Sequence, residues 1–208
     1  MHSELDHLVW AVPDLDEGIK SLAQRTGVTS AVGGRHPGVG THNALKDLGG
    51  RRYFEILAPD PAQDRFSSFG RLIQGIERPK LLTWAARTDD IRAVSEAAKD
   101  AGCAPGVVLS LSRRRPDGQS LSWKLMQISG HGFGPLLPFF VEWRADEHPS
   151  DVAPRGCRLS GFELRTPEPK PLRALLSSLG LDPSTVAEGV EPEIRAVLET
   201  PKGRVELV

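Results

Sequence analysis

Residues 5–12 read LDHLVWAV, an apolar and β-branched run that predicts a β-strand. Pro13 and Asp14 interrupt this run, and Asp14 can cap a helix over residues 15–26, whose apolar side chains recur at helical spacing. Gly27 ends the helical pattern, because glycine readily adopts the left-handed conformation found at helix C-termini. The opening of the chain therefore predicts a strand that is followed directly by an amphipathic helix.

The same succession occurs three times along the 208 residues. A second copy opens with the strand-like residues 80–86 and ends its helix at Gly102. A third copy opens with residues 158–164 and ends its helix at Gly180. Strand-like runs follow each helix, and one helix followed by several antiparallel strands is typical of α+β proteins. We therefore predict an α+β fold of repeated β-α-β-β-β modules within one compact unit. The modules span residues 1–78, 79–147 and, for a shortened third repeat, 155–208.

The composition excludes several classes of function. The chain has 26 Lys and Arg against 27 Asp and Glu, which gives a formal net charge of −1. This balance provides no electrostatic attraction to nucleic acid or to an anionic membrane. No run approaches the roughly 18 apolar residues of a membrane span, and no signal peptide pattern opens the chain. Cys103 and Cys157 lack a metal-binding spacing and are expected to be reduced. We expect a cytoplasmic protein that binds a small molecule, and neither nucleic acid nor membrane.

Isolated polar residues interrupt three predicted strands. His7 lies in the first strand, Glu55 in residues 53–57 and Glu142 in residues 139–143. A buried carboxylate is costly unless it is paired, protonated or bound to a metal, and imidazole with carboxylates suits Zn, Fe, Mn or Ni. Taken alone, a strand histidine is more often a core residue and a strand glutamate is more often exposed. Spacing by itself does not bring the three residues together.

The segment of residues 33–45, GGRHPGVGTHNAL, is the most distinctive loop-like stretch. Glycines let a backbone approach a ligand closely, but no Gly-Lys-Ser/Thr sequence is present that would indicate a phosphate loop. A tight hairpin with solvated polar side chains is the alternative interpretation. The candidates for substrate contact in this segment are Arg35, His36, His42 and Asn43.

Other conspicuous residues have simpler interpretations. Residues 113–118, RRRPDG, predict the charged tip of a hairpin rather than a nucleic-acid site. Trp84 and Trp123 are candidate walls of a substrate site, although tryptophans on strands are more often core residues. His2 and His148 are expected to be exposed to solvent.

Four motifs, in order, resemble the glyoxalase-like domain proteins of the vicinal oxygen chelate superfamily, which also contains bleomycin resistance proteins and extradiol dioxygenases. These motifs are residues 5–15, 34–45, 53–58 and 137–143. The resemblance covers about residues 5–145 and implies paired modules whose mixed sheets curl around a cavity. It also implies a divalent metal held from the first and last strands of the modules, at the positions of His7, Glu55 and Glu142.

The sequence departs from this pattern in the second module. Thr83 or Leu82 stands where the resemblance places a second first-strand histidine. Three protein ligands and an open position are one interpretation, a further nitrogen from His36 or His42 is another, and the absence of a tightly bound metal is a third.

The resemblance implies a metal-dependent lyase or isomerase that acts on a small oxygenated substrate. The metal would chelate two vicinal oxygens and stabilise an oxyanion, and Glu142 would transfer the proton as the catalytic base. Arg35, His36 and Asn43 would orient the substrate oxygens.

Two other functions remain open. A non-haem iron ring-cleaving oxygenase would use His7, His42 and Glu55 as its ligands. A metal-free protein would sequester a small molecule between aromatic walls that include Trp84 and Trp123. The sheet of a lone third module would be uncovered, so we expect it to pack on the first two modules or on a partner chain, which would give a homodimer.

Overall fold

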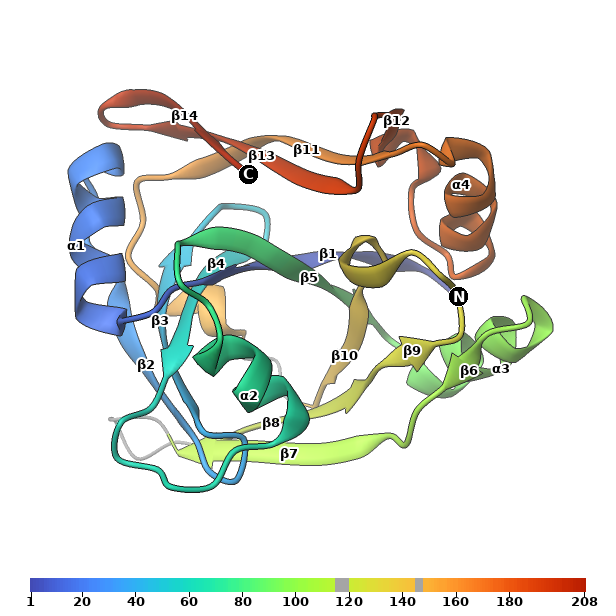
Figure 1. Ribbon diagram of the computed structural model, residues 1–208, viewed down its shortest axis with the longest axis horizontal. Coiled ribbons are helices and arrows are strands. Elements are labelled where there is room, and N and C mark those ends of the chain that lie inside the picture. Colours follow the sequence, from blue (N-terminus) through green and yellow to red (C-terminus); the bar gives the residue numbers. More distant parts are fainter. Residues whose placement is uncertain (115–119, 145–147) are drawn as a thin grey trace.

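The computed structural model describes residues 1–114, 120–144 and 148–208. An eight-stranded mixed sheet forms most of the molecule (Figure 1). Its strands, in spatial order, are β2 (Ala31–His36), β3 (Thr41–Asp47), β4 (Tyr53–Pro59), β1 (Ser3–Ala11), β5 (Lys80–Thr88), β10 (Phe139–Trp143), β8 (Ser120–Met126) and β7 (Leu109–Arg114). The sheet curls so strongly that its two edge strands, β2 and β7, approach each other. The tip of the hairpin predicted at residues 113–118 lies outside the described residues, but its two strands pair as expected.

The two halves of this sheet repeat one arrangement. In each half the first strand pairs in parallel with the last, as β1 does with β4 and β5 does with β10. The two first strands then pair antiparallel with each other at the centre of the sheet. One helix directly follows the first strand of each half, α1 (Leu15–Thr26) after β1 and α3 (Ile91–Asp100) after β5. This arrangement confirms the predicted α+β fold with a curled sheet.

Local sequence signals determine the ends of α1. The side chain of Asp14 accepts a hydrogen bond from the backbone N–H of Glu17, at 2.9 Å. Gly27 closes the helix with a φ of 76°, in the left-handed region that glycine tolerates best. The helix therefore begins and ends where the sequence predicted, because both signals act within one turn.

The third part of the chain forms a separate four-stranded sheet. Its strands, in spatial order, are β12 (Val186–Glu188), β11 (Arg158–Thr166), β13 (Glu193–Thr200) and β14 (Gly203–Leu207). The strand β11 pairs in parallel with β12 and antiparallel with β13. The first strand of this part, β11, therefore lies between two other strands of its own part. In the first module the first strand, β1, lies at the edge of the module and pairs there with the last strand, β4. The predicted succession of elements is present, but the strand order of the first two modules is not repeated.

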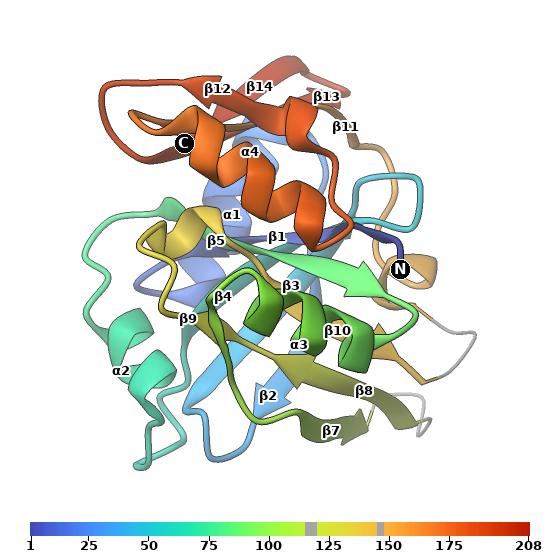
Figure 2. The same ribbon diagram turned by 90° about the vertical axis from the view of Figure 1, so that its right-hand side faces the viewer.

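The small sheet packs on the large one. Strand β13 contacts β5 directly, and the helix α4 (Pro169–Ser178) lies beside β12 (Figure 2). Trp84 of β5 contacts Phe162 of β11 edge to face, with ring centroids 5.1 Å apart. Buried side chains of all three parts join one hydrophobic cluster. The third part therefore covers its sheet by packing on the first two, which is one of the two outcomes that the sequence predicted.

Short elements cover the concave face of the large sheet. The helix α2 (Ser68–Gln74) places Ile73 against Val9 and Leu57 on that face. The segment that follows the 3-10 helix η2 (Pro149–Asp151) packs against the same face, where Ala153 meets Leu45 and Tyr53. The remaining short elements are β6 (Ala104–Pro105), β9 (Ile128–Ser129), η1 (Gly134–Leu136) and η3 (Pro183–Thr185). The concave face is therefore enclosed by segments from outside the sheet.

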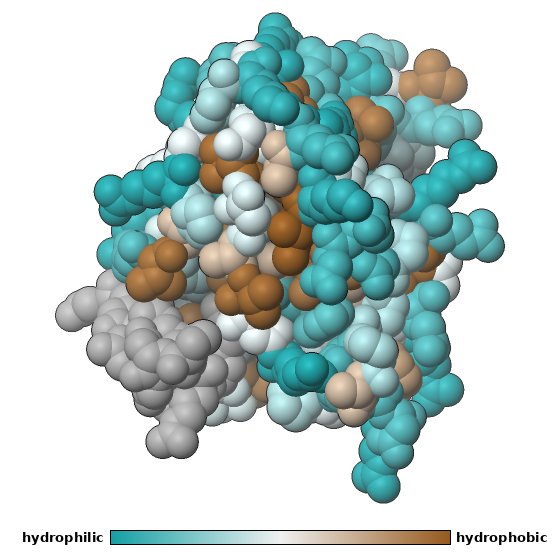
Figure 3. All heavy atoms as spheres, turned by 90° about the vertical axis from the view of Figure 1, so that its left-hand side faces the viewer, coloured by the Kyte–Doolittle hydropathy of each residue, from teal (hydrophilic) through white to brown (hydrophobic). Residues whose placement is uncertain are grey.

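The surface adds little to the assignment of a partner. The face seen from the side of α1 is mostly hydrophilic, with apolar side chains gathered near its centre (Figure 3). Within the described ranges, no helix is long and apolar enough to cross a membrane.

A buried lysine joins α1 to β3. Lys46 is fully buried, and its Nζ donates hydrogen bonds to Thr26 Oγ1 at 2.7 Å and to the carbonyl oxygen of Val28 at 2.6 Å. Burial lowers the pKa of Lys46 from 10.5 to about 8, because the charged ammonium loses its hydration. This burial could not be predicted from the sequence, since a lysine in a strand is ordinarily solvated.

We expect the stability that Lys46 confers to depend on pH. Between about pH 8 and 10.5 the unfolded chain binds more protons at this residue than the folded chain, so the free energy of unfolding rises with pH. Relative to Lys46→Met, wild-type protein should gain up to about 3 kcal/mol across this window. Urea unfolding of both proteins at several pH values measures the difference. Parallel pH curves for the two proteins would contradict the prediction.

Candidate functional site

Two predicted site residues meet on the concave face of the large sheet. His7 of β1 and Glu55 of β4 lie on adjacent parallel strands, in which Val9 pairs with Glu55. The imidazole Nε2 of His7 is 3.7 Å from Oε2 of Glu55. Their exposed fractions are only 4% and 8%. The structure therefore brings together a histidine and a glutamate that are 48 positions apart in the sequence.

A bulge in β1 places a carboxylate behind His7. The register between β1 and β5 shifts between Leu5 and His7, so that Asp6, the residue between them, departs from the regular alternation of faces. Asp6 Oδ1 lies 2.6 Å from His7 Nδ1. The arrangement of a carboxylate, a histidine and an open imidazole nitrogen is typical of histidines that bind metals.

Asp6 accepts two further hydrogen bonds at its other oxygen. Trp143 Nε1 donates at 2.9 Å, and His148 Nε2 lies at 3.0 Å. Burial raises the pKa of Asp6, but the hydrogen bonds and charges of His148 and His7 outweigh this and hold the pKa well below its usual range. An ionised Asp6 accepts a hydrogen bond from His7 Nδ1, and the other ring nitrogen, Nε2, faces Glu55.

Glu55 is held from its other side by an amide. Asn43 Nδ2 donates to Glu55 Oε1 at 2.5 Å, and the same nitrogen lies 3.4 Å from His36 Nε2. His36 Nδ1 in turn lies 2.9 Å from the hydroxyl of Thr41. The amide oxygen of Asn43 is buried and has no hydrogen-bond partner among the described residues. A series of neighbouring polar side chains thus leads from the half-buried His36 through Asn43 and Glu55 to the buried His7.

Aromatic rings enclose the imidazole of His7. Tyr53 stacks on it with centroids 4.3 Å apart and planes inclined by 18°. Phe139 meets it edge to face at 5.4 Å. Trp123 lies beside Trp143, with centroids 5.6 Å apart, on the part of the concave face that β8 and β10 form. The predicted position of Trp123 near a substrate site is compatible with this arrangement.

The prediction that Glu142 completes the metal site is not met. Successive side chains of a strand alternate between faces, and Phe139 and Trp143 occupy the concave face. Glu142 therefore points to the opposite face, where its Oε2 accepts from the backbone N–H of Ile91 at 2.9 Å and its Oε1 pairs with Lys124. It caps the start of α3 and cannot serve as the base of a site at His7.

The strand register shows which residue replaces the expected second glutamate. Val9 and Ala85 each lie six positions before the first residue of the helix that follows. Val9 pairs with Glu55, and Ala85 pairs with Phe139. Phe139 is thus the counterpart of Glu55, and Thr83 is the counterpart of His7. The second module contributes a hydroxyl and a phenyl ring where the first contributes an imidazole and a carboxylate.

Three other predicted contacts lie elsewhere. Arg35 and His42 are paired across β2 and β3, next to the pairs that carry His36 and Asn43, and therefore face away from Glu55. Arg35 forms an ion pair with Asp60. His42 lines a separate pocket of about 400 Å³ together with Asp60, Phe66 and residues at the start of α1. These two residues do not contact the His7–Glu55 pair.

Trp84 and His148 also differ from expectation. Trp84 is 2% exposed, donates to the carbonyl oxygen of Leu136 at 3.0 Å and packs in the main core, so it forms no substrate wall. His148, expected at the surface, is fully buried against Asp6. The sequence around His148 does not indicate this contact, because Asp6 and His148 are 142 positions apart and meet only in the folded protein.

Sequence reasoning missed four members of this site: Asp6, Tyr53, Trp143 and His148. Asp6 was adjacent to His7, but strand alternation assigned it to the opposite face, and the bulge left no mark in the sequence. Tyr53 did share the predicted face of Glu55, which was a usable signal. Within the described parts of the chain, no group of three or more His, Cys, Asp and Glu is arranged to hold a metal.

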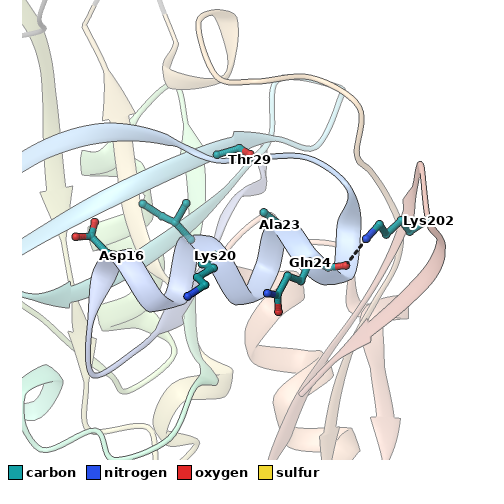
Figure 4. Close-up of a pocket in the computed structure, with 7 residues that line it drawn as sticks. Asp16, Lys20, Ala23, Gln24, Thr29 and Lys202 are labelled. Atoms are coloured by element: carbon teal, nitrogen blue, oxygen red, sulfur yellow. Dashed lines mark hydrogen bonds between the residues drawn. The ribbon is translucent and has the colours of Figure 1, made fainter.

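A second surface pocket lies far from these residues. It has a volume of about 520 Å³ and lies between α1 and the turn at Lys202. The Nζ of Lys202 donates to the carbonyl oxygen of Gln24 near the end of the helix, at 2.9 Å (Figure 4). Neither this pocket nor the one at His42 is lined by His7 or Glu55.

Two β-α-β-β-β modules joined in one curled sheet, with a histidine and a glutamate from the first and last strands of one module, define a protein of the vicinal oxygen chelate superfamily. The family described as a glyoxalase-like domain matches residues 5–180, and the chain belongs to that family. Among curated proteins, none matches the chain significantly.

Solved structures resemble the chain at low sequence identity. A hypothetical protein from Staphylococcus aureus is 14% identical, with a TM-score of 0.70 over 92% of this chain and 88% of that chain. Methylmalonyl-CoA epimerase from Mycobacterium tuberculosis is 21% identical, with a TM-score of 0.47 over 66% of this chain and 86% of that chain. The epimerase of Streptomyces coelicolor is 18% identical, with a TM-score of 0.46 over 68% of this chain and 97% of that chain. At 14% identity, the likeness to the Staphylococcus aureus protein concerns the fold alone.

Proposed function

We propose that the protein is a metal-dependent lyase or isomerase for a small oxygenated molecule, with a divalent cation held between His7 and Glu55. The gap between His7 Nε2 and Glu55 Oε2 carries this proposal. At 3.7 Å the gap is too long for a hydrogen bond, and with the His7 proton on Nδ1 the two atoms would present lone pairs to each other. A cation between them would remove the repulsion and would occupy a distance compatible with metal–ligand bonds of about 2.0–2.2 Å.

The donor set fits a cation that accepts nitrogen and oxygen. Imidazole and carboxylate suit Zn, Fe, Mn or Ni, as the sequence predicted. The amide oxygen of Asn43 lies next to Glu55, has no hydrogen-bond partner in the described ranges, and adds a neutral donor to this neighbourhood. Two protein ligands leave positions for water and for two oxygens of a substrate.

The residues of the chain have separate tasks in this proposal. A bound cation would polarise adjacent substrate oxygens and stabilise the charge that develops on them. Asp6 keeps the proton on His7 Nδ1, and Asn43 orients Glu55. Tyr53 and Phe139 shield the imidazole from water. His36, half-buried beside Asn43, is placed to bind or protonate a substrate oxygen.

One observation favours a second function. The second module supplies Thr83 and Phe139 where a second histidine and glutamate would complete a symmetric site. A protein that sequesters a small molecule without a metal would use such a half-site, which offers neither an imidazole nor a carboxylate. The oxygenase has less support, because His42 faces away from His7 and Glu55. A cytoplasmic location and a homodimer stay predictions from the sequence.

Metal titration tests the proposal directly. Isothermal titration of metal-free protein with Zn²⁺, Mn²⁺ and Ni²⁺ should show one site per chain for at least one cation. Glu55→Gln and His7→Ala should each weaken that binding at least tenfold, on the scale of effects at metal sites. The matched control is Glu142→Gln, which removes a strand glutamate on the opposite face and should leave the affinity unchanged.

The competing function predicts a different result. If no cation binds to wild-type protein, or if Glu55→Gln binds as tightly as wild type, the metal-dependent function is wrong. Sequestration of a small molecule would then be the remaining candidate.

A further inference from the structure

We propose that His148 is a positioning residue for the His7–Glu55 pair, so that the segment linking the second module to the third part of the chain completes the site of the first module. This inference rests on the proposed function of that pair. It is carried by the hydrogen bonds of His148 to Ser150 and to Asp6, because the same Asp6 carboxylate also contacts His7.

The protonation of His148 follows from its contacts. The backbone N–H of Ser150 lies 3.3 Å from His148 Nδ1 and can only donate. Nδ1 is therefore an acceptor, and the ring carries its proton on Nε2. Nε2 donates that proton to Asp6 Oδ2 at 3.0 Å. The backbone of the linker thus fixes the tautomer of His148 and, with it, one donor to Asp6.

Asp6 transmits this arrangement to His7. Its Oδ2 accepts hydrogen bonds from His148 and Trp143, and its Oδ1 faces His7 Nδ1. With Oδ2 engaged from two other segments, the carboxylate cannot rotate away from the imidazole. His7 then keeps its proton on Nδ1 and its lone pair toward Glu55.

The ring of His148 is also held sterically. Tyr53, which stacks on His7, meets His148 edge to face at 5.5 Å. Trp143 meets it nearly perpendicularly at 5.4 Å. Because His148 is fully buried between these rings, it has one orientation in which to reach Asp6.

The contacts of Ser150 separate this arrangement from a hydrolase triad. Its hydroxyl lies 2.7 Å from His148 Nδ1, so that serine, histidine and Asp6 form a chain. Ser150 is only 4% exposed, and its own backbone N–H shares the same imidazole nitrogen. His148 caps η2 in a reciprocal arrangement with Asp151. The serine therefore anchors the histidine rather than attacking a substrate.

The test compares His148→Leu with His148→Gln by nitrogen-15 NMR of the His7 imidazole and by titration with Zn²⁺. In wild type, His7 should carry its proton on Nδ1. In His148→Leu a fraction of His7 should move its proton to Nε2, and the affinity for Zn²⁺ should fall at least tenfold. His148→Gln should recover both properties in part, because its amide can donate to Asp6.

A matched histidine provides the control. His131 also has both ring nitrogens in backbone contacts, with Ile128 and Phe133, but lies outside the site. His131→Leu should leave the His7 tautomer and the affinity unchanged. If His148→Leu fails to fold, Trp143→Phe removes another donor to Asp6 while keeping an aromatic ring. In this variant a smaller fraction of His7 should move its proton to Nε2.

The outcomes separate the two proposals. An unchanged His7 tautomer in folded His148→Leu or Trp143→Phe overturns the positioning role, whatever the metal does. A wild-type protein that binds no Zn²⁺, Mn²⁺ or Ni²⁺ overturns the proposed function, while the NMR comparison still decides whether His148 positions His7.

Discussion

Replacing Asp6 by alanine is expected to lower the free energy of unfolding by about 3–5 kcal/mol, as the loss of one partner of a buried charged network does. The substitution removes the acceptor of His7, His148 and Trp143 at once. Each of these nitrogens would then be buried without a partner, which is costly because water cannot replace the carboxylate. Urea unfolding at pH 7 measures the effect.

The pH dependence of this effect has a defined sign. The pKa of folded Asp6 lies below its ordinary value of 3.8, so the unfolded chain takes up the proton first as the pH falls. The stability that Asp6 confers is therefore present above pH 3.8 and is lost as the pH falls toward the lower folded pKa. The difference in the free energy of unfolding between wild type and Asp6→Ala should therefore become smaller as the pH falls below 3.8.

An exposed aspartate is the control for Asp6. Asp89 precedes α3 at the surface, and Asp89→Ala should change the stability by no more than about 0.5 kcal/mol. A cost for Asp6→Ala that is equally small would mean that the buried network contributes nothing to the fold.

Replacing Gly70 by alanine should displace α2 from the concave face. A Cβ atom at this position would lie 1.8 Å from the carbonyl oxygen of Val39, which belongs to the turn between β2 and β3. A backbone oxygen cannot rotate away as a side chain can, so the helix or the turn must shift. We expect a cost of about 2–4 kcal/mol, although alanine favours helices over glycine by about 1 kcal/mol.

Displacement of α2 should be visible beyond the stability. Ile73 of this helix covers Val9 and Leu57 on the face that carries His7 and Glu55. Amide hydrogen exchange over residues 67–76 should therefore accelerate in Gly70→Ala. The control is Gly75→Ala in the same segment, where the nearest atom to a new Cβ is 3.6 Å away. Exchange that is the same in both variants would show that Gly70 does not hold α2 in place.

The sequence determined half of the candidate site. His7 and Glu55 were both identified because a polar residue in an apolar strand is locally visible, and the fold of one module brings such strands side by side. Glu142 was identified by the same signal and belongs to the opposite face. The signal is identical for a residue that enters the site and for one that caps a helix, because alternation alone does not say which face is concave.

What the sequence by itself determined was therefore local: the ends of α1 at Asp14 and Gly27, the strand and helix succession, and the α+β class. Only the tertiary structure decided that Phe139 would take the position in the second module that Glu55 has in the first, that a bulge would turn Asp6 toward His7, and that His148 would close the network. The physical reason is the sequence separation of the residues that interact. Caps and periodicity depend on residues within a few positions, whereas strand register and burial depend on the packing of segments that are from 54 to 142 positions apart here.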